Sequence, residues 1–206
     1  VICITNPLDV IVMALQKYSG LPKNKVVGMA GILDSSRFIF FLSEKLKINT
    51  KKIKSFVLGG HGDTMVAMLN HTIVDGESIQ NIVKSGKISQ DELNKIVERT
   101  KKGGAEIVKY LEKGSAFYAP AAAGVEMAES YLKDLKKEVP CAAYLDGEYG
   151  FKKIYAGVPV IIGKNGVEKV VEIKLSSEEK DQFNKSIKSV QDLFSAAKKI
   201  DSSLNN

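Results

Sequence analysis

The sequence predicts an α/β fold in which an N-terminal strand–helix–strand unit is followed by an α+β part. Residues 1–31 contain two short apolar strands on either side of a helix, the pattern of a parallel βαβ unit with a right-handed crossover. Residues 139–173 contain three strands in succession, and the last two flank a glycine turn typical of a hairpin. Serine–x–x–glutamate capping boxes at 89–92 and 176–179 predict the start of two further helices.

The first strand is predicted over VICIT (1–5), where apolar and β-favouring residues form a run typical of a buried strand. Asn6-Pro7 then predicts the start of a helix, because asparagine caps helix N-termini well and proline suits the first helical position. Gly20 ends this helix, and KVVGMAG (25–31) predicts the second strand. A chain rarely begins with a core strand, so we expect that the sequence is the later part of a longer protein.

The middle of the chain is predicted to form a helix over 33–46 and a strand over 53–58 that runs into the segment GGHGDT (59–64). Residues 64–76 continue as strand and turn. A long helix is predicted over 89–111, with Gly103-Gly104 inside it. Each of these glycines costs about 1 kcal/mol of helix stability relative to alanine, so we expect that they allow close approach to a neighbouring element.

The last part of the chain is predicted to contain an alanine-rich helix over 121–134 and a strand over 139–145. A hairpin spans 158–173 and turns at Lys164-Asn165-Gly166. The final helix follows the capping box at 176–179, and its core-facing side chains recur at helical spacing. They are Phe183, Ile187, Val190, Leu193, Phe194 and Ala197.

Composition limits the class of protein. The 206 residues, 44% of them hydrophobic, are enough for one sizeable domain. The net charge of +6 comes mainly from lysines spread over helix faces, which predicts a solvated surface and no nucleic-acid partner. No apolar run reaches the roughly 18 residues of a membrane span and no signal peptide is visible, so we expect no membrane association and a cytoplasmic location. Cys3 and Cys141 are expected to be free buried thiols, and no metal-site spacing is present.

GGHGDT places His61 at the carboxyl end of a predicted strand, where α/β proteins commonly carry catalytic side chains. Glycines on both sides let a ligand approach the backbone closely. Two questions are open from the spacing alone: whether His61 is only a turn histidine, and whether Asp63 is its partner. The segment is not a dinucleotide-binding loop, because G-x-G-x-x-G does not occur in the sequence. His71 lies between a strand and a turn and is expected to be structural or on the surface.

Asp34 and Arg37 stand three residues apart at the start of a predicted helix and therefore share a face. An ordinary surface ion pair would contribute about 0–1 kcal/mol. The apolar residues around them in LDSSRFIFFL (33–42) favour another interpretation, in which at least one of the two points into a cleft. Asn6, similarly, could be a helix cap and nothing more.

Four separated segments occur in a fixed order: ITNPLDV (4–10), AGILDSSRF (30–38), GGHGDTMV (59–66) and GSAFYAPAAA (114–123). Together they resemble the NAD-dependent malate dehydrogenases of the lactate-dehydrogenase-like type, and the resemblance runs through essentially the whole chain. It implies the C-terminal catalytic domain of the lactate/malate dehydrogenase fold, preceded by the last βαβ piece of a Rossmann domain.

The resemblance implies a role for each of four residues. His61 matches the catalytic proton acceptor, and Asp34 matches the carboxylate that orients it. Arg37 matches the arginine that binds the substrate carboxylate, and Asn6 matches the asparagine that binds the substrate oxygen; the bond from Asn6 to Pro7 is expected to be cis. The chemistry suits oxidation of (S)-malate to oxaloacetate, because a histidine that titrates near neutrality can take the hydroxyl proton and a guanidinium can bind both carboxylate oxygens.

NAD is the implied cofactor. Ile4, Thr5 and Asn6 match the strand end that lines the nicotinamide side of NAD, and Pro120 is a further expected cofactor-binding position. Ala116 stands where lactate dehydrogenases usually place a threonine near the substrate, which leaves room for the longer malate. No metal is implied.

The resemblance also divides the chain into a remnant of the NAD-binding Rossmann domain, 1–31, and the substrate-binding catalytic domain, 32–206. The glycine-rich pyrophosphate loop, the acidic residue for the ribose and a mobile loop with two substrate arginines are absent from this sequence. We therefore expect the activity to require a further N-terminal part. The family's oligomers imply a homodimer or homotetramer.

Three other interpretations fit the same residues. A lactate dehydrogenase or another 2-hydroxyacid dehydrogenase would share these motifs, since the loop that discriminates the substrates is absent from the sequence. The chain could instead be a non-catalytic oligomerisation module. A metallohydrolase that uses His61, Asp63 and His71 is the third.

Overall fold

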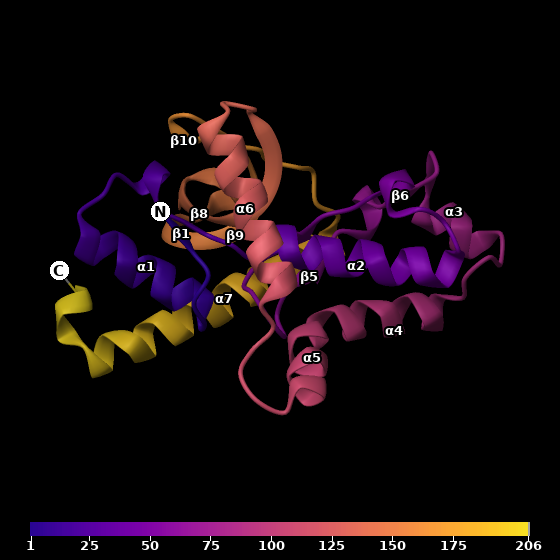
Figure 1. Cartoon of the computed structure of the whole chain (residues 1–206), viewed down its shortest axis with the longest axis horizontal. Helices are drawn as coiled ribbons and strands as arrows, with labels where there is room; N and C mark the ends of the chain where they lie inside the picture. The colour runs from indigo at the N-terminus through magenta and orange to yellow at the C-terminus, as the bar shows by residue number, and fades with distance from the viewer. Residues whose placement is uncertain (206) are drawn as a thin grey trace.

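The computed structural model describes residues 1–205 and places a five-stranded mixed sheet beside a group of helices and short strands (Figure 1). In chain order the elements are β1 (Ile2–Cys3), α1 (Leu8–Ser19), β2 (Val27–Gly28), α2 (Gly31–Leu46), β3 (Ile53–Lys54), β4 (Val57–Leu58), β5 (Val66–Ala67), β6 (Ile73–Val74), β7 (Glu77–Ser78), α3 (Ile79–Lys84), α4 (Gln90–Lys101), α5 (Gly103–Leu111), α6 (Tyr118–Leu132), β8 (Lys137–Asp146), β9 (Lys152–Gly163), β10 (Gly166–Val170) and α7 (Ser177–Ile200). Short 3-10 turns connect several of them. None of the helices within residues 1–205 combines the length and the apolar character that crossing a membrane requires.

The large sheet has the strand order β1-β2-β8-β9-β10. Its first pair is parallel, with Ile2 opposite Val27 and Cys3 opposite Gly28, as the predicted βαβ unit requires. The other neighbours are antiparallel, and β9 and β10 form the predicted hairpin. The predicted α/β fold class is therefore confirmed, with one parallel pair at one edge and an antiparallel meander over the rest.

Two hydrophobic cores meet at the helix α2, which begins beside the large sheet and runs alongside α4 in Figure 1. Ile32 and Leu33 in its first turn pack into the core of the large sheet. Phe38 and Leu42, farther along, pack into a second core with α3, α4 and the short strands. Each fully buried side chain of this size contributes about 1.5–3 kcal/mol. Because it contributes to both cores, α2 holds the two parts of the molecule together.

An isolated bridge fastens the end of β4 to the large sheet. Gly59 N–H donates to the Gly157 carbonyl over 2.8 Å, and Gly157 N–H donates to the Gly59 carbonyl over 3.1 Å. The backbones approach so closely that a Cβ atom on Gly157 would lie 2.3 Å from the Gly59 oxygen. The first residue of the segment GGHGDT, Gly59, is thus bound to β9.

The strand predicted over 53–58 is split. Ile53 pairs with Val74 in a three-stranded sheet, whereas Val57 pairs with Ala67 in a separate two-stranded ladder. The chain changes partners at Ser55, whose buried hydroxyl hydrogen-bonds the Thr72 hydroxyl over 2.7 Å. The prediction of one continuous strand was wrong, because the two halves pair with different strands, β6 and β5.

The helix predicted over 89–111 is broken at Lys102 into α4 and α5. The break places Gly103 against the side chain of Arg37, where an added Cβ would lie 3.0 Å from Arg37 Cδ. The predicted continuity was therefore wrong, while the expected close approach of this glycine pair to a neighbouring element is confirmed. Both predicted capping boxes, at Ser89 and Ser176, are present.

Two smaller expectations are also corrected. Helix α1 begins at Leu8 with Pro7 at the N-cap and without a side-chain cap, so Asn6 does not cap it. The bond from Asn6 to Pro7 is cis, as expected. On the last helix, Leu193 is exposed and does not share the core with Phe183 and its neighbours.

Gly157→Ala is expected to lower the free energy of unfolding by about 1–3 kcal/mol or more. The new methyl group would collide with the backbone of Gly59, which cannot rotate out of the way as a side chain can. Urea unfolding of the complete protein measures this loss. Gly124→Ala is the matched control: in helix α6 the nearest neighbour of the added Cβ is Ile4 Cγ2 at 3.8 Å, so the same substitution should stabilise by about 0.5–1 kcal/mol. Equal stability of the two variants would contradict the importance of the bridge.

Candidate functional site

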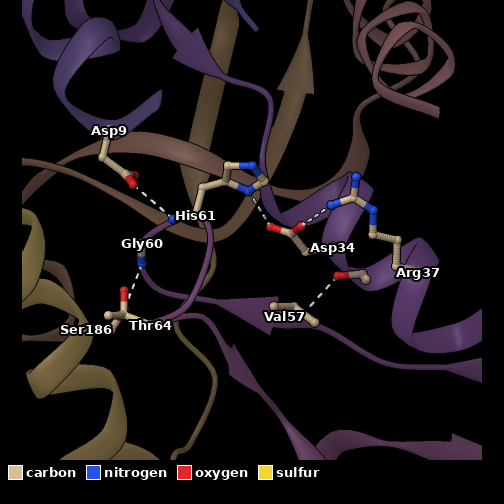
Figure 2. A network of polar contacts seen from close by, with 9 residues as sticks. Asp9, Asp34, Arg37, Val57, Gly60, His61, Thr64 and Ser186 are labelled. Carbon is tan, nitrogen blue, oxygen red and sulfur yellow. Dashed lines mark hydrogen bonds and ion pairs between the residues drawn. The ribbon is translucent and has the colours of Figure 1, made fainter. Parts of the chain in front are cut away.

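The candidate site is built around the loop between β4 and β5, which carries His61 (Figure 2). Gly59 and Gly62 have φ values of +88° and +106°, a region that residues with a side chain rarely adopt. These glycines let the chain turn sharply, so that the ring of His61 faces the first turn of α2. The loop geometry follows from the glycine spacing that the sequence displays.

His61 contacts Asp34 directly. The ring Nδ1 lies 2.8 Å from Asp34 Oδ2, and the exposed fraction of the side chain is 17% for the histidine and 2% for the aspartate. A carboxylate accepts hydrogen bonds only, so Nδ1 carries the hydrogen and Nε2 is left as the acceptor of the neutral ring. Within residues 1–205, Nε2 has no hydrogen-bond partner. The ring is therefore held at one nitrogen and able to exchange a proton at the other.

Arg37 contacts the second oxygen of the Asp34 carboxylate. Its Nη1 lies 3.4 Å from Asp34 Oδ1, and 12% of its side chain is exposed. The guanidinium Nε is buried and has no partner among the described residues. Arg37 thus has donors left over beyond the contact with Asp34, and an anion is the ligand they fit.

The surroundings of the ring favour its protonated form. Burial lowers the pKa of His61, but the hydrogen bond to Asp34 and the negative charges of Asp34 and Asp9 outweigh burial and the positive charge of Arg37. The net result is a pKa raised above the ordinary value of 6.5. A histidine of this kind can both accept and return a proton near neutral pH.

Asp9, in the first turn of α1, is a second carboxylate beside the loop. Its Oδ2 accepts the backbone N–H of His61 over 2.9 Å, as Figure 2 shows. Burial is the largest influence on this group and raises the pKa of Asp9 to about 6, although the N–H and the charge of His61 oppose the rise. The sequence predictions did not single out Asp9.

Further contacts anchor the loop from two directions. The Ser35 hydroxyl of α2 accepts the Val57 N–H over 2.9 Å. The Ser186 hydroxyl of α7 accepts the Gly60 N–H over 2.8 Å and donates to Thr64 Oγ1 over 3.3 Å. These residues were also missed. Ser35 lies beside Asp34 in the sequence, but nothing in the sequence around Ser186 indicates that it reaches residue 60.

The other predicted site residues lie outside this network. Ile4, Thr5 and Asn6 are exposed where the chain leaves β1, and α6 packs against that strand. Ala116 precedes α6 and Pro120 lies in its first turn, both half-buried. Among the described residues, no hydrogen bond joins these five side chains to His61, Asp34 or Arg37. Their proposed roles require a ligand between the two groups.

Asp63 is exposed and is not the carboxylate that contacts the ring. His71 is directed elsewhere, with Nε2 2.8 Å from the Lys174 carbonyl. Within residues 1–205, the histidine, cysteine, aspartate and glutamate side chains form no cluster of three or more suited to a metal ion. The grouping of His61, Asp63 and His71 that a metallohydrolase would need is therefore not formed by the side chains described.

A cleft of about 780 Å³ lies between α4 and α7. It reaches Asp63 and Thr64 but is not lined by His61, Asp34 or Arg37. The residues that make up the candidate site therefore do not line this cleft.

Comparisons with known proteins agree with the resemblance seen in the sequence. A family model described as the lactate/malate dehydrogenase, alpha/beta C-terminal domain matches residues 32–200. The malate dehydrogenase of Pelagibacter ubique is 63% identical over 205 residues, which are 100% of this chain and 64% of that protein. That of Caulobacter vibrioides is 56% identical over 204 residues, 99% of this chain and again 64% of the relative. The chain thus spans about two thirds, 64%, of the length of these relatives.

Solved structures of both kinds of dehydrogenase are similar to the chain. The malate dehydrogenase of Cryptosporidium parvum superposes with a TM-score of 0.94 at 46% identity, covering 96% of this chain and 63% of that one. A lactate dehydrogenase from the same organism, complexed with lactic acid and nicotinamide adenine dinucleotide, has a TM-score of 0.93 at 46% identity, covering 100% of this chain and 62% of that one.

The buried carboxyl of Asp9 is expected to make stability depend on pH. Its folded-state pKa is raised from 3.8 to about 6, so its favourable contribution is complete below pH 3.8 and is lost as the pH rises through 6. This change corresponds to on the order of 3 kcal/mol, because one pKa unit is worth about 1.4 kcal/mol. The side chain introduced by Asp9→Asn cannot ionise. As the pH rises from 4 to 7, the free energy of unfolding of this variant should therefore increase relative to that of the wild type. Chemical denaturation of both proteins across this range measures the difference, and parallel curves would contradict it.

Proposed function

The chain belongs to the lactate/malate dehydrogenase family, and on that basis we propose that it forms the catalytic part of an NAD-dependent malate dehydrogenase. The proposed reaction is the reversible oxidation of (S)-malate to oxaloacetate. The observation that carries the proposal is the contact between His61 Nδ1 and Asp34, which leaves Nε2 of a partly exposed ring to exchange a proton with a hydroxyl group.

The proposed proton step uses His61 and Asp34 as a unit. Oxidation of a 2-hydroxyacid removes a hydride from C2 and a proton from its hydroxyl group. Nε2 of His61 takes the proton, while the carboxylate of Asp34 keeps Nδ1 protonated and stabilises the imidazolium that forms. In the reverse direction the same nitrogen returns the proton to the carbonyl oxygen. NAD, when bound, accepts the hydride.

The end of β1 fits the nicotinamide part of that cofactor. Ligands of α/β proteins bind beyond the carboxyl ends of parallel strands, and β1 and β2 are the parallel pair here. Ile4 follows β1 with 57% of its surface exposed, next to Gly124 of α6. An exposed apolar side chain at this position suits the flat face of a nicotinamide ring. Thr5, Asn6 and Pro120 complete the proposed cofactor-binding group.

Arg37 is the proposed binding residue for the substrate carboxylate. Its contact with Asp34 leaves Nη2 and part of the fork to form paired hydrogen bonds with the two carboxylate oxygens. Asn6 is proposed to bind the oxygen at C2 through its amide. The small side chain of Ala116 leaves space for the second carboxylate arm of malate.

The proposed organisation of the whole protein follows its relatives. Residues 1–31 would complete an NAD-binding domain with a further N-terminal part, and 32–206 would form the catalytic domain. A homodimer or homotetramer is proposed, and the exposed apolar side chains of Tyr118, Val125 and Leu132 on α6 support coverage by further protein. A cytoplasmic location is part of the proposal.

A second candidate is a lactate dehydrogenase. The observation in its favour is that a lactate dehydrogenase with bound lactic acid matches the fold about as well as a malate dehydrogenase does. The two activities share the 2-hydroxyacid group on which His61 and Arg37 would act.

His61→Ala in the complete enzyme is expected to lower kcat for malate oxidation by a factor of about 10²–10⁴ while the circular dichroism spectrum stays unchanged. Asp34→Asn should also lower kcat, because the ring loses the charge that holds it. Asp63→Asn is the control of equal charge and is expected to retain wild-type activity. If Asp63→Asn is inactive and Asp34→Asn is active, the assignment of the carboxylate role to Asp34 is wrong.

Oxaloacetate is expected to be reduced with a kcat/KM about 100-fold or more above that for pyruvate. Ala116→Thr tests the pocket: the added bulk should lower kcat/KM for oxaloacetate more than that for pyruvate. Steady-state assays with both substrates decide the question. A preference of the wild type for pyruvate would replace the malate assignment with the lactate one.

A further inference from the structure

The proposed mechanism uses Asp34 and leaves a second buried carboxyl group without a role. Asp9 is only 5% exposed, and its Oδ2 accepts the backbone N–H of His61 over 2.9 Å. Its other oxygen, Oδ1, is buried and has no hydrogen-bond partner among residues 1–205. A side chain that can carry a charge thus lies inside the protein against the residue that exchanges the proton.

Backbone anchoring alone does not account for an aspartate at this position. A neutral serine or asparagine oxygen could accept the same N–H, and the Gly60 N–H is held in that way by the hydroxyl of Ser186. A buried carboxylate with one unpartnered oxygen is costly by comparison. A nearby cation would stabilise the charge of Asp9, and the adjacent group that can become a cation is the ring of His61.

We propose that Asp9 is a positioning residue that acts through His61: it fixes the backbone of the histidine, and its negative charge strengthens the hold of the ring on the transferred proton. The inference rests on the proposed role of His61 as the proton acceptor. Asp9 does not touch the reacting atoms in this scheme, and the proton moves between the substrate hydroxyl and Nε2.

The charges around the ring are consistent with this role. Asp34 contacts the ring from α2 and Arg37 binds Asp34, Asp9 on α1 lies against the backbone of His61, and Ser186 on α7 is neutral. With His61 protonated, two carboxylates face two cations, and the group is balanced. With a neutral ring, one carboxylate is in excess. Removal of the charge of Asp9 should therefore weaken the attraction of the site for the proton.

The coupling also works in the other direction. Burial raises the pKa of Asp9 to about 6, and the charge of His61 opposes that rise, so the protonation of each group affects the other. Protonation of Asp9 in mild acid removes one of the two carboxylate charges near His61. The amide hydrogen of His61, which points at Asp9, should register this event directly.

The test is an NMR titration of the His61 ring in the complete protein, with its signal assigned by loss in His61→Gln. Asp9→Asn keeps an oxygen that can accept the His61 N–H and removes only the charge. The expected result is a lower pKa of His61 in Asp9→Asn than in the wild type. Asp63→Asn is the matched control, since it removes an exposed carboxylate two residues from His61 and should leave the pKa unchanged. His71 serves as an internal reference, and superimposable His61 curves for Asp9→Asn and wild type would overturn the proposal.

A second measurement needs no variant and applies even if Asp9→Asn folds poorly. The backbone amide signal of His61 in the wild type should show two titration steps, one from its ring and one from Asp9. If Asp9 titrates and the ring signal of His61 shows no response in the same pH range, the charge of Asp9 does not act on the ring and the proposal fails.

Kinetics separate this inference from the proposed function. Malate oxidation requires the neutral ring, so the acid limb of the kcat/KM profile should move to lower pH in Asp9→Asn, as should the alkaline limb for oxaloacetate reduction. If the complete protein oxidises no 2-hydroxyacid while Asp9→Asn still lowers the pKa of His61, the proposed function fails and the coupling stands. If the enzyme is active but neither the pKa nor the profile moves, the coupling fails.

Discussion

The buried carboxylate of Asp34 is the constraint on which the arrangement of the site depends. A charged side chain that is 2% exposed is stable only when hydrogen-bond donors surround it. His61 supplies a donor from the β4–β5 loop, and Arg37 supplies another from the next turn of α2. Arg37 in turn packs against Gly103, so one buried charge determines the relative positions of the loop, α2 and the α4–α5 break.

The packing of the molecule makes that constraint rigid. Helix α2 contributes to both hydrophobic cores, and adjacent Val57 and Leu58 of β4 also belong to different cores. The loop begins at their junction, where Gly59 is bridged to the large sheet and Gly60 is bound to α7. Catalytic geometry requires positions accurate to a fraction of an ångström. The backbone of this loop is bound to several elements, in addition to the contact that the ring of His61 makes with Asp34.

The same organisation explains why the reaction class is easier to assign than the substrate. His61, Asp34 and Arg37 would act on the hydroxyl group and the carboxylate that malate and lactate have in common. The chain matches solved malate and lactate dehydrogenases with nearly equal TM-scores, and it spans 64% of the length of the malate dehydrogenases to which it is similar. Within the chain, discrimination between the two substrates depends on small features such as the space beside Ala116.

Local sequence patterns were enough to predict the features that depend on neighbouring residues: the parallel strand pair, both capping boxes, the glycines that turn the His61 loop, and the shared helix face of Asp34 and Arg37. The partner of His61 could be named only through the resemblance, since the spacing alone left open whether Asp63 is that partner. Tertiary structure decided what depends on contacts between distant segments. The long helix breaks at Lys102 and Gly103 packs against Arg37, the chain changes strand partners at Ser55, and Asp9 and Ser186 reach the loop from helices 52 and 126 residues away in the chain. A local pattern has no information about such contacts, because they form only when both cores are packed.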